Sequence, residues 1–158
     1  MNKIIFLFFL LFLNCTYYLK PPLPEGIKTI GVENFSNSSE RLGIEIFVTQ
    51  SFIDGILEDR RIPLKDLNNC DLLIKGEITR YLRSPFGVTG GGEVFSYKVI
   101  IRAKINFLKK DGSQIFEGRE FQGESVYDAR EKSEEDAIKE AAKDLSRKVI
   151  QYIYAQAI

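Results

Sequence analysis

The feature that most constrains this chain is an alternation between residues 95 and 107, in which every odd position is apolar and every even position but one is polar. The apolar side chains at the odd positions are Phe95, Tyr97, Val99, Ile101, Ala103, Ile105 and Phe107, and between them lie Ser96, Lys98, Ile100, Arg102, Lys104 and Asn106. Because successive side chains of a β-strand point to opposite faces of its sheet, the pattern predicts a strand with one buried and one wet face. At about 3.3 Å per residue this strand would be about 43 Å long, well beyond the usual length of about 5 or 6 residues.

Two further long strands are predicted to lie beside it. Residues 72–82 place Leu72, Ile74, Ile78 and Leu82 on one face. Residues 114–127 follow the turn-forming segment Lys110 to Ser113, in which Asp and Gly tolerate the positive φ of a tight hairpin. The three strands should therefore form an antiparallel meander.

Two helices and a short strand complete the predicted elements. Ser133 to Asp136 has the form of an N-terminal capping box, and a helical apolar stripe follows it as far as Ile153. A strand at residues 27–32, ended by turn-forming residues 34 and 36–39, precedes a helix over residues 40–59 that Ser38 or Ser39 would cap. The apolar side chains near helical spacing in this helix are Leu42, Ile46, Ile53, Ile56 and Leu57. Dense β-branched residues at 44–48 leave a strand there as the alternative.

The predicted element order is β-α-β-β-β-α, which is typical of an α+β fold. We expect a four-stranded, mixed but mostly antiparallel sheet with two helices packed on one face. A parallel connection between the first two strands should cross over right-handed. With 158 residues the chain is predicted to hold a single folded domain, at residues 26–158.

Composition and motifs exclude several classes of function. The chain has no His, which excludes Ser-His-Asp and Cys-His catalysis and His-ligated zinc or iron. Lys+Arg 22 balance Asp+Glu 22, so no basic excess favours nucleic acid. Gly90 to Gly92 lacks the Lys-Ser/Thr of a phosphate loop and predicts a hairpin tip. No sequence pattern places the carboxylates in a shared pocket; they are Glu93, Glu117, Glu120 and Glu124. We therefore expect no enzyme activity. From the composition we also expect no metal, no cofactor and no nucleic acid partner.

The first residues predict a lipoprotein signal peptide. Residues 4–13 are an unbroken apolar run, shorter than the roughly 20 residues that a membrane-spanning helix needs. The run leads to Cys15 and then to a segment with three prolines. We predict a signal peptide at residues 1–14, acylation of Cys15, and an extended tether over residues 15–25, with an ordinary signal peptide as the alternative. Acylation would leave Cys70 without a disulfide partner, as a half-buried thiol.

Cations on the wet strand faces are the candidate binding groups. Lys98, Arg102 and Lys104 share one strand face, while Lys75, Arg80 and Arg83 lie on the surface or at the end of the preceding strand. Such side chains can serve only to discourage edge pairing. They can also bind the phosphates of an anionic lipid, arginine bidentately. Phe86, among Arg, Pro and other apolar residues at the hairpin end, suits insertion into a partner.

Several segments, read in order, resemble the lipopolysaccharide-assembly lipoprotein family LptE. They are Pro24 to Ile30, Asn34 to Asn37, Asp71 to Tyr81, Tyr97 to Val99 and Gly123 to Asp128, followed by the acid-capped C-terminal helix. Together they cover nearly the whole chain after Cys15. The opening segment is also similar to curli-secretion and penicillin-binding-protein-activator lipoproteins.

The resemblance implies a non-enzymatic protein that is lipid-anchored on the periplasmic face of the Gram-negative outer membrane. It would plug the lumen of the large β-barrel LptD, help that barrel to assemble, and assist lipopolysaccharide transport to the outer leaflet. The candidate contacts with barrel or lipopolysaccharide are then Lys75, Arg80, Arg83, Phe86, Lys98, Arg102 and Lys104. Two alternatives stay open: a periplasmic lipoprotein that regulates a cell-wall synthase or another envelope machine, and a small hydrolase.

Overall fold

The computed structural model describes residues 26–156, so the predicted signal peptide, the lipidation site at Cys15 and the tether to residue 25 lie outside the described residues. The elements, in chain order, are β1 (Ile30–Val32), β2 (Ser36–Asn37), α2 (Ile44–Asp59), β3 (Leu72–Val88), β4 (Val94–Leu108), β5 (Gln114–Asp128) and α3 (Glu134–Ala155). They confirm the predicted α+β class.

The sheet is mixed, in the order β1-β3-β4-β5. β1 runs parallel to β3, and β3, β4 and β5 form the predicted antiparallel meander. The predicted turn at residues 36–39 is partly wrong, because Ser36 and Asn37 form the short strand β2, which also pairs with β3. This pairing depends on Phe35, whose buried ring lies over Gly76. A Cβ atom on Gly76 would lie 2.1 Å from the ring. This ring holds the chain against β3 beyond the end of β1.

Helix α3 forms as the sequence predicts. Ser133 caps it, and the reciprocal bonds of the capping box with Asp136 are both present. Its apolar stripe is buried against β4 and β5, and the helix comes so close to β5 that a Cβ atom on Gly123 would lie 2.1 Å from the carbonyl oxygen of Ala141. Glycine is therefore required at this contact.

Helix α2 differs from its prediction in both its start and its buried side. It begins at Ile44 after Gly43, whose φ of 86° only glycine adopts readily, and no side chain caps it, so the predicted cap by Ser38 or Ser39 is wrong. Its buried residues are Ile44, Val48, Phe52 and Ile56. Of the predicted stripe, Leu42, Ile46 and Leu57 are exposed. Because this helix is apolar on two sides, the sequence alone did not identify the side that packs.

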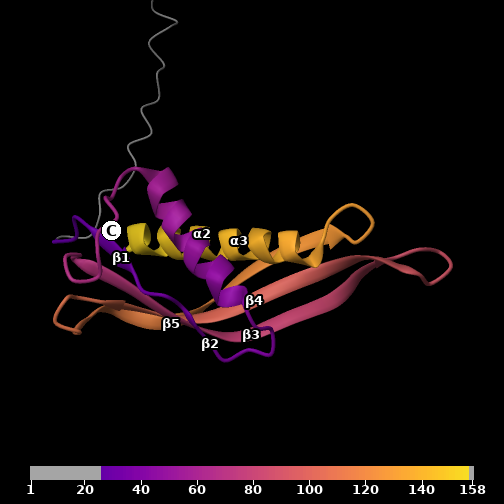
Figure 1. Cartoon of the computed structure of the whole chain (residues 1–158), viewed down its shortest axis with the longest axis horizontal. Coiled ribbons are helices and arrows are strands. Elements are labelled where there is room, and N and C mark those ends of the chain that lie inside the picture. Colours follow the sequence, from indigo (N-terminus) through magenta and orange to yellow (C-terminus); the bar gives the residue numbers. More distant parts are fainter. Residues whose placement is uncertain (1–25, 157–158) are drawn as a thin grey trace, which may run out of the picture.

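Both helices lie over the same face of the sheet, and the core lies between them and that face (Figure 1). The β3–β4 hairpin extends past the helices at one end of the molecule, which we call the distal end (Figure 1). The described chain begins at the opposite, proximal end, where the loop after α2 and the β4–β5 turn also lie (Figure 1). The sheet face away from the helices is left open.

Candidate functional site

A β-bulge in β3 decides which side chains reach the open face. Ile78 pairs with Ala103 and Arg80 with Arg102, so Thr79 is an extra residue. Beyond it the even residues of β3 change from the helix-covered face to the open face. The prediction that Leu82 shares the buried face of Ile78 is therefore wrong: Leu82 is 40% exposed on the open face.

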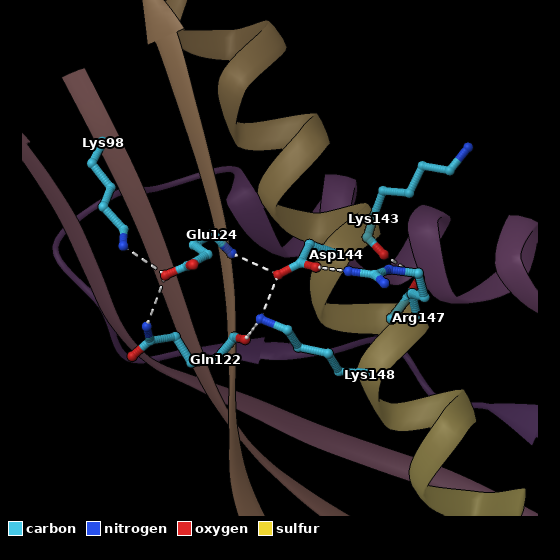
Figure 2. Close-up of polar contacts among 8 residues, drawn as sticks. Lys98, Gln122, Glu124, Lys143, Asp144, Arg147 and Lys148 are labelled. Carbon is cyan, nitrogen blue, oxygen red and sulfur yellow. Dashed lines mark hydrogen bonds and ion pairs between the residues drawn. The ribbon is translucent and has the colours of Figure 1, made fainter. Parts of the chain in front are cut away.

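Five of the predicted cations lie on the open face, and most of them are paired. Lys75 Nζ lies 2.9 Å from Glu33 Oε1, and Lys98 Nζ lies 2.8 Å from Glu124 Oε2 (Figure 2). Arg102 donates to Gln122 Oε1 at 3.0 Å. The two without an ion pair or hydrogen bond in the described part of the chain are Arg80 and Lys104.

Acids and amides on the neighbouring strands balance these cations. In the register of the sheet, Lys104 lies between Glu77 on β3 and Glu120 on β5. The bond from Lys98 lowers the pKa of the Glu124 carboxyl below its ordinary value, so this carboxylate stays charged near neutral pH. The open face is thus a ladder of mixed charge rather than a basic patch.

Arg83 lies on the opposite, helix-covered face, apart from the other candidate cations. Its guanidinium stacks 3.5 Å from the centroid of the Tyr97 ring, donates to Tyr127 Oη at 2.8 Å and lies 3.3 Å from Glu134 of α3. Tyr81 donates to the same Glu134 at 2.9 Å, and burial together with this bond raises the pKa of Tyr81. The bulge places both side chains there, so Arg83 joins β3 to the start of α3.

Apolar side chains gather on the open face toward the distal end. Leu82, Ile100 and the 45% exposed Val126 lie on β3, β4 and β5, beside Lys98. Further out, Phe86 and Val88 are 64% and 61% exposed. Of these residues only Phe86 was predicted from the sequence as a contact, because the bulge that brings Leu82 here leaves no mark in the sequence.

The hairpin that carries Phe86 is also an unpaired sheet edge. β1 and β2 accompany β3 only as far as Ile78, so the remaining outer edge of β3 has no neighbouring strand within residues 26–156. This edge accommodates Pro85, which has no N–H to donate. An exposed edge next to exposed apolar side chains is a surface that a partner can cover.

The side chains of the open face are arranged in a way that suits binding. Within residues 26–156, no group of three His, Cys, Asp or Glu side chains is placed to hold a metal ion. A ladder of charges beside an apolar group can contact a molecule that has both charged and apolar parts, or a polar protein wall.

The sequence also matches a known protein family. The LptE model, described as lipopolysaccharide assembly, matches residues 27–153 and so includes every strand and nearly all of α3. The chain belongs to the LptE family. No curated protein matches its sequence.

The chain also shares its fold with proteins of known structure, one of which is a lipoprotein. It is similar to lipoprotein B from Nitrosomonas europaea, with a TM-score of 0.55 and 14% identity over 85% of each chain. The PelC dodecamer of Paraburkholderia phytofirmans gives a TM-score of 0.54 and 12% identity, covering 85% of this chain and 93% of PelC. The hypothetical protein CT253 from Chlamydia trachomatis gives 0.59 and 6% identity, covering 83% of this chain and 98% of CT253. Between residues 26 and 156, the chain has no helix with the length and apolar character to cross a membrane.

Proposed function

We propose that this LptE-family protein is a lipid-anchored, non-enzymatic component of the outer membrane that occupies the lumen of an LptD-like β-barrel. In this role it helps the barrel to assemble and assists lipopolysaccharide transport to the outer leaflet. The observation that carries the proposal is the open face, a charge ladder with an apolar group at the projecting hairpin. Its anchor would be the acylated Cys15, on the periplasmic side of the membrane.

A barrel lumen matches the physical needs of the open face. The interior of a membrane β-barrel is polar, so it offers donors and acceptors to both signs of the charge ladder. Enclosure would also cover the free outer edge of β3 beyond Ile78, which in solution is a site for unwanted strand pairing. The long strands gain a purpose in this setting, because they carry that surface past the helices.

The distal half of the same face suits lipopolysaccharide. Arg80 and Arg102 lie opposite each other in the sheet, and Arg80 has no partner in the described part of the chain. Arginine binds phosphate bidentately, while Leu82, Ile100 and Val126 lie close by for acyl chains. A phosphorylated amphiphile would therefore meet both of its chemical parts on neighbouring strands.

Charge reversal on β4 tests this proposal. We expect Lys98→Glu with Arg102→Glu to weaken lipopolysaccharide binding or barrel assembly, because both side chains project from the open face and contribute nothing to the apolar core. The control pair, Lys139→Glu with Lys143→Glu, makes the same net charge change on exposed positions of α3. Thermal unfolding of each variant would verify that the fold is kept.

The measurement is purification from native membranes in mild detergent, with mass spectrometry of the co-purifying chains and of the peptide at Cys15. We expect an LptD-like barrel to co-purify with the unsubstituted protein and with the α3 variant. Less of the barrel should co-purify with the β4 variant. Unchanged barrel recovery and lipopolysaccharide binding with the β4 pair would overturn the role of the open face. Recovery of cell-wall synthases instead of a barrel would support the regulator alternative.

A further inference from the structure

The outer edge of β3 has strand neighbours along its first half only. β1 and β2 run parallel to it there. Glu33 N–H donates to the Ile74 carbonyl at 3.0 Å, and Ser38 N–H, just after β2, donates to the Ile78 carbonyl at 2.9 Å. β3 then runs on into the distal hairpin (Figure 1). This edge therefore accepts neighbouring strands, but beyond Ile78 it has none within residues 26–156.

The bulge at Thr79 determines which backbone groups of the remaining edge point outward. Up to the bulge they belong to even residues, such as Ile74 and Ile78. One extra residue reverses the alternation, so beyond it the odd residues point outward. β4 supports this assignment, because the Phe95 carbonyl accepts from Ala129 N–H at 2.9 Å and the odd residues of β4 thus turn toward the β5 side. The residues of β3 that are paired with odd residues of β4, and so point outward themselves, are Tyr81, Arg83 and Pro85.

We call residues 81–85 of β3 the free edge. Its outward groups are the N–H and C=O of Tyr81 and of Arg83 and the C=O of Pro85, and no bond to them from a neighbouring segment exists in the described part of the chain. Equivalent groups recur every two residues, at about 6.7 Å. An extended backbone repeats its donors and acceptors at the same spacing, whereas a helix does not. The free edge therefore matches a β-strand, and Pro85, which has no N–H, ends it.

Side-chain contacts hold the free edge extended before a partner arrives. On the helix-covered side, Tyr81 donates to Glu134 at 2.9 Å. The Arg83 guanidinium lies 3.3 Å from Glu134 and 3.5 Å from the centroid of the Tyr97 ring. On the open face, Leu82 is 40% exposed. A strand that joins this edge would thus meet a fixed backbone, which lowers the ordering cost of binding, and an apolar side chain next to one of its own.

We propose that an extended segment of a partner protein adds to the sheet as a strand along the free edge. A segment of about five residues would match the length of this edge, with an apolar side chain beside Leu82. Main-chain hydrogen bonds would provide affinity, and the side chain beside Leu82 would provide specificity. The proposal deepens the proposed function, on which it rests for the presence of a protein partner, and names the kind of segment that binds.

The first test is hydrogen exchange at single residues, on the full chain alone and on the complex that co-purifies with it from native membranes in mild detergent. In the isolated protein the amides of Tyr81 and Arg83 should exchange fast, while that of Leu82, which points to β4, should exchange more slowly. In the complex the amides of Tyr81 and Arg83 should slow at least about tenfold. Unchanged fast exchange at both residues, or the absence of any co-purifying protein, would overturn the proposal. Protection that grows with concentration in the isolated protein would identify a second copy as the occupant and would also overturn it.

Arg83→Pro and Arg83→Ala separate strand pairing from simple coverage of the edge. Both variants lose the contacts of the guanidinium, but only proline also removes the outward N–H. Arg83→Pro should therefore recover about 2- to 12-fold less partner than Arg83→Ala, which corresponds to one hydrogen bond. Val126→Pro and Val126→Ala are the matched control pair. Val126 lies two residues beyond Glu124, whose N–H points to Asp144 at the opposite edge of the sheet, so recovery should not differ between these two.

Thermal unfolding verifies that the variants fold, and if Arg83→Pro does not, single-residue exchange in the unsubstituted complex still decides. Equal recovery with folded Arg83→Pro and Arg83→Ala would overturn the proposal. A barrel that co-purifies while the Tyr81 amide exchanges fast would leave the proposed function standing and remove only the added strand. Protection of the same amide by a protein that is not a barrel would keep the added strand and remove the barrel.

Discussion

Asp144 illustrates how a single residue closes the outer edge of the sheet. β5 is the last strand, so its outward backbone groups have no strand partner within residues 26–156. Asp144 accepts from Glu124 N–H at 3.1 Å, and Lys148, 2.6 Å from Asp144, donates to the Gln122 carbonyl at 2.9 Å (Figure 2). Burial acts to raise the pKa of Asp144, but hydrogen bonds from Lys148, Arg147 and Glu124 N–H outweigh it and hold the pKa below its ordinary value.

Asp144→Ala should lower the free energy of unfolding at neutral pH by about 1.5 to 3 kcal/mol, because the carboxylate's hydrogen bonds from Lys148, Arg147 and the Glu124 N–H are lost. The Asp144 carboxyl has a lower pKa in the folded state than in the unfolded state, where its pKa is about 4. Its ionised form therefore stabilises the fold at pH values above about 4, and this stabilisation is lost as the pH falls through the folded-state pKa. Urea unfolding should therefore show the difference from the unsubstituted protein shrinking below about pH 4. A difference that is constant with pH would contradict this account.

Glu135→Ala is the matched control on the same helix. Glu135 also pairs with a lysine four residues later, Lys139, at 2.7 Å. Both side chains of this pair are exposed and Glu135 bonds no strand, so the pair should contribute much less than Asp144 does. Equal losses for the two variants would mean that the contact with the edge of β5 adds nothing.

Among the elements, β3 is the one whose irregularity shapes the binding surface. The extra residue at Thr79 lets Tyr81 and Arg83 face α3 while Leu82 faces outward. A strand without the bulge would place Arg83 among the open-face cations and turn Leu82 inward. The bulge thus determines both the apolar group on the open face and the link from the hairpin to Glu134.

Two single-residue deletions test the role of the bulge. Deleting Thr79 leaves a regular strand in which Arg80 still pairs with Arg102. We therefore expect the free energy of unfolding to fall by about 1 kcal/mol or less. Deleting Leu82 shifts the distal half of β3 by one residue and turns Arg83 away from Tyr127 and Glu134. Chemical unfolding should show a clearly larger loss for the second deletion. The reverse order would mean that the bulge itself, through its added twist, stabilises the hairpin.

The elements also show where sequence reasoning succeeds and where it stops. The alternation between residues 95 and 107 predicted β4 well, because the two-residue period follows from strand geometry alone. The capping box of α3 is equally local. The buried side of α2 depends on long-range packing, since Ile44 and Ile46 are both apolar and only Ile44 is buried. For the site, the cations were visible in the sequence, but partners such as Glu33 and Glu124 come from distant segments.

At the scale of the whole molecule, the buried core and the exposed apolar hairpin occupy different parts of the long axis. The core lies where the helices cover the sheet, around buried residues such as Ile74, Ile105 and Leu145. The distal hairpin lies beyond the helices, and Phe86 and Val88 are exposed there (Figure 1). Few buried contacts hold it, so its hydrogen bonds should open without unfolding of the core.

Hydrogen exchange can measure this division directly. In the isolated protein, backbone amides of residues 84–94 should exchange through local opening, while those of residues 72–78 and 99–107 should require global unfolding, because the latter strands are covered by helices. If the hairpin enters a barrel, its amides should become protected in the complex, whereas amides of the core should change little. Slow exchange along the whole hairpin in the isolated protein would contradict the division into two parts. Fast exchange that persists in the complex would exclude the hairpin from the barrel interface. The partner would then bind the charge ladder on the open face, in the part of the sheet whose other face the helices cover.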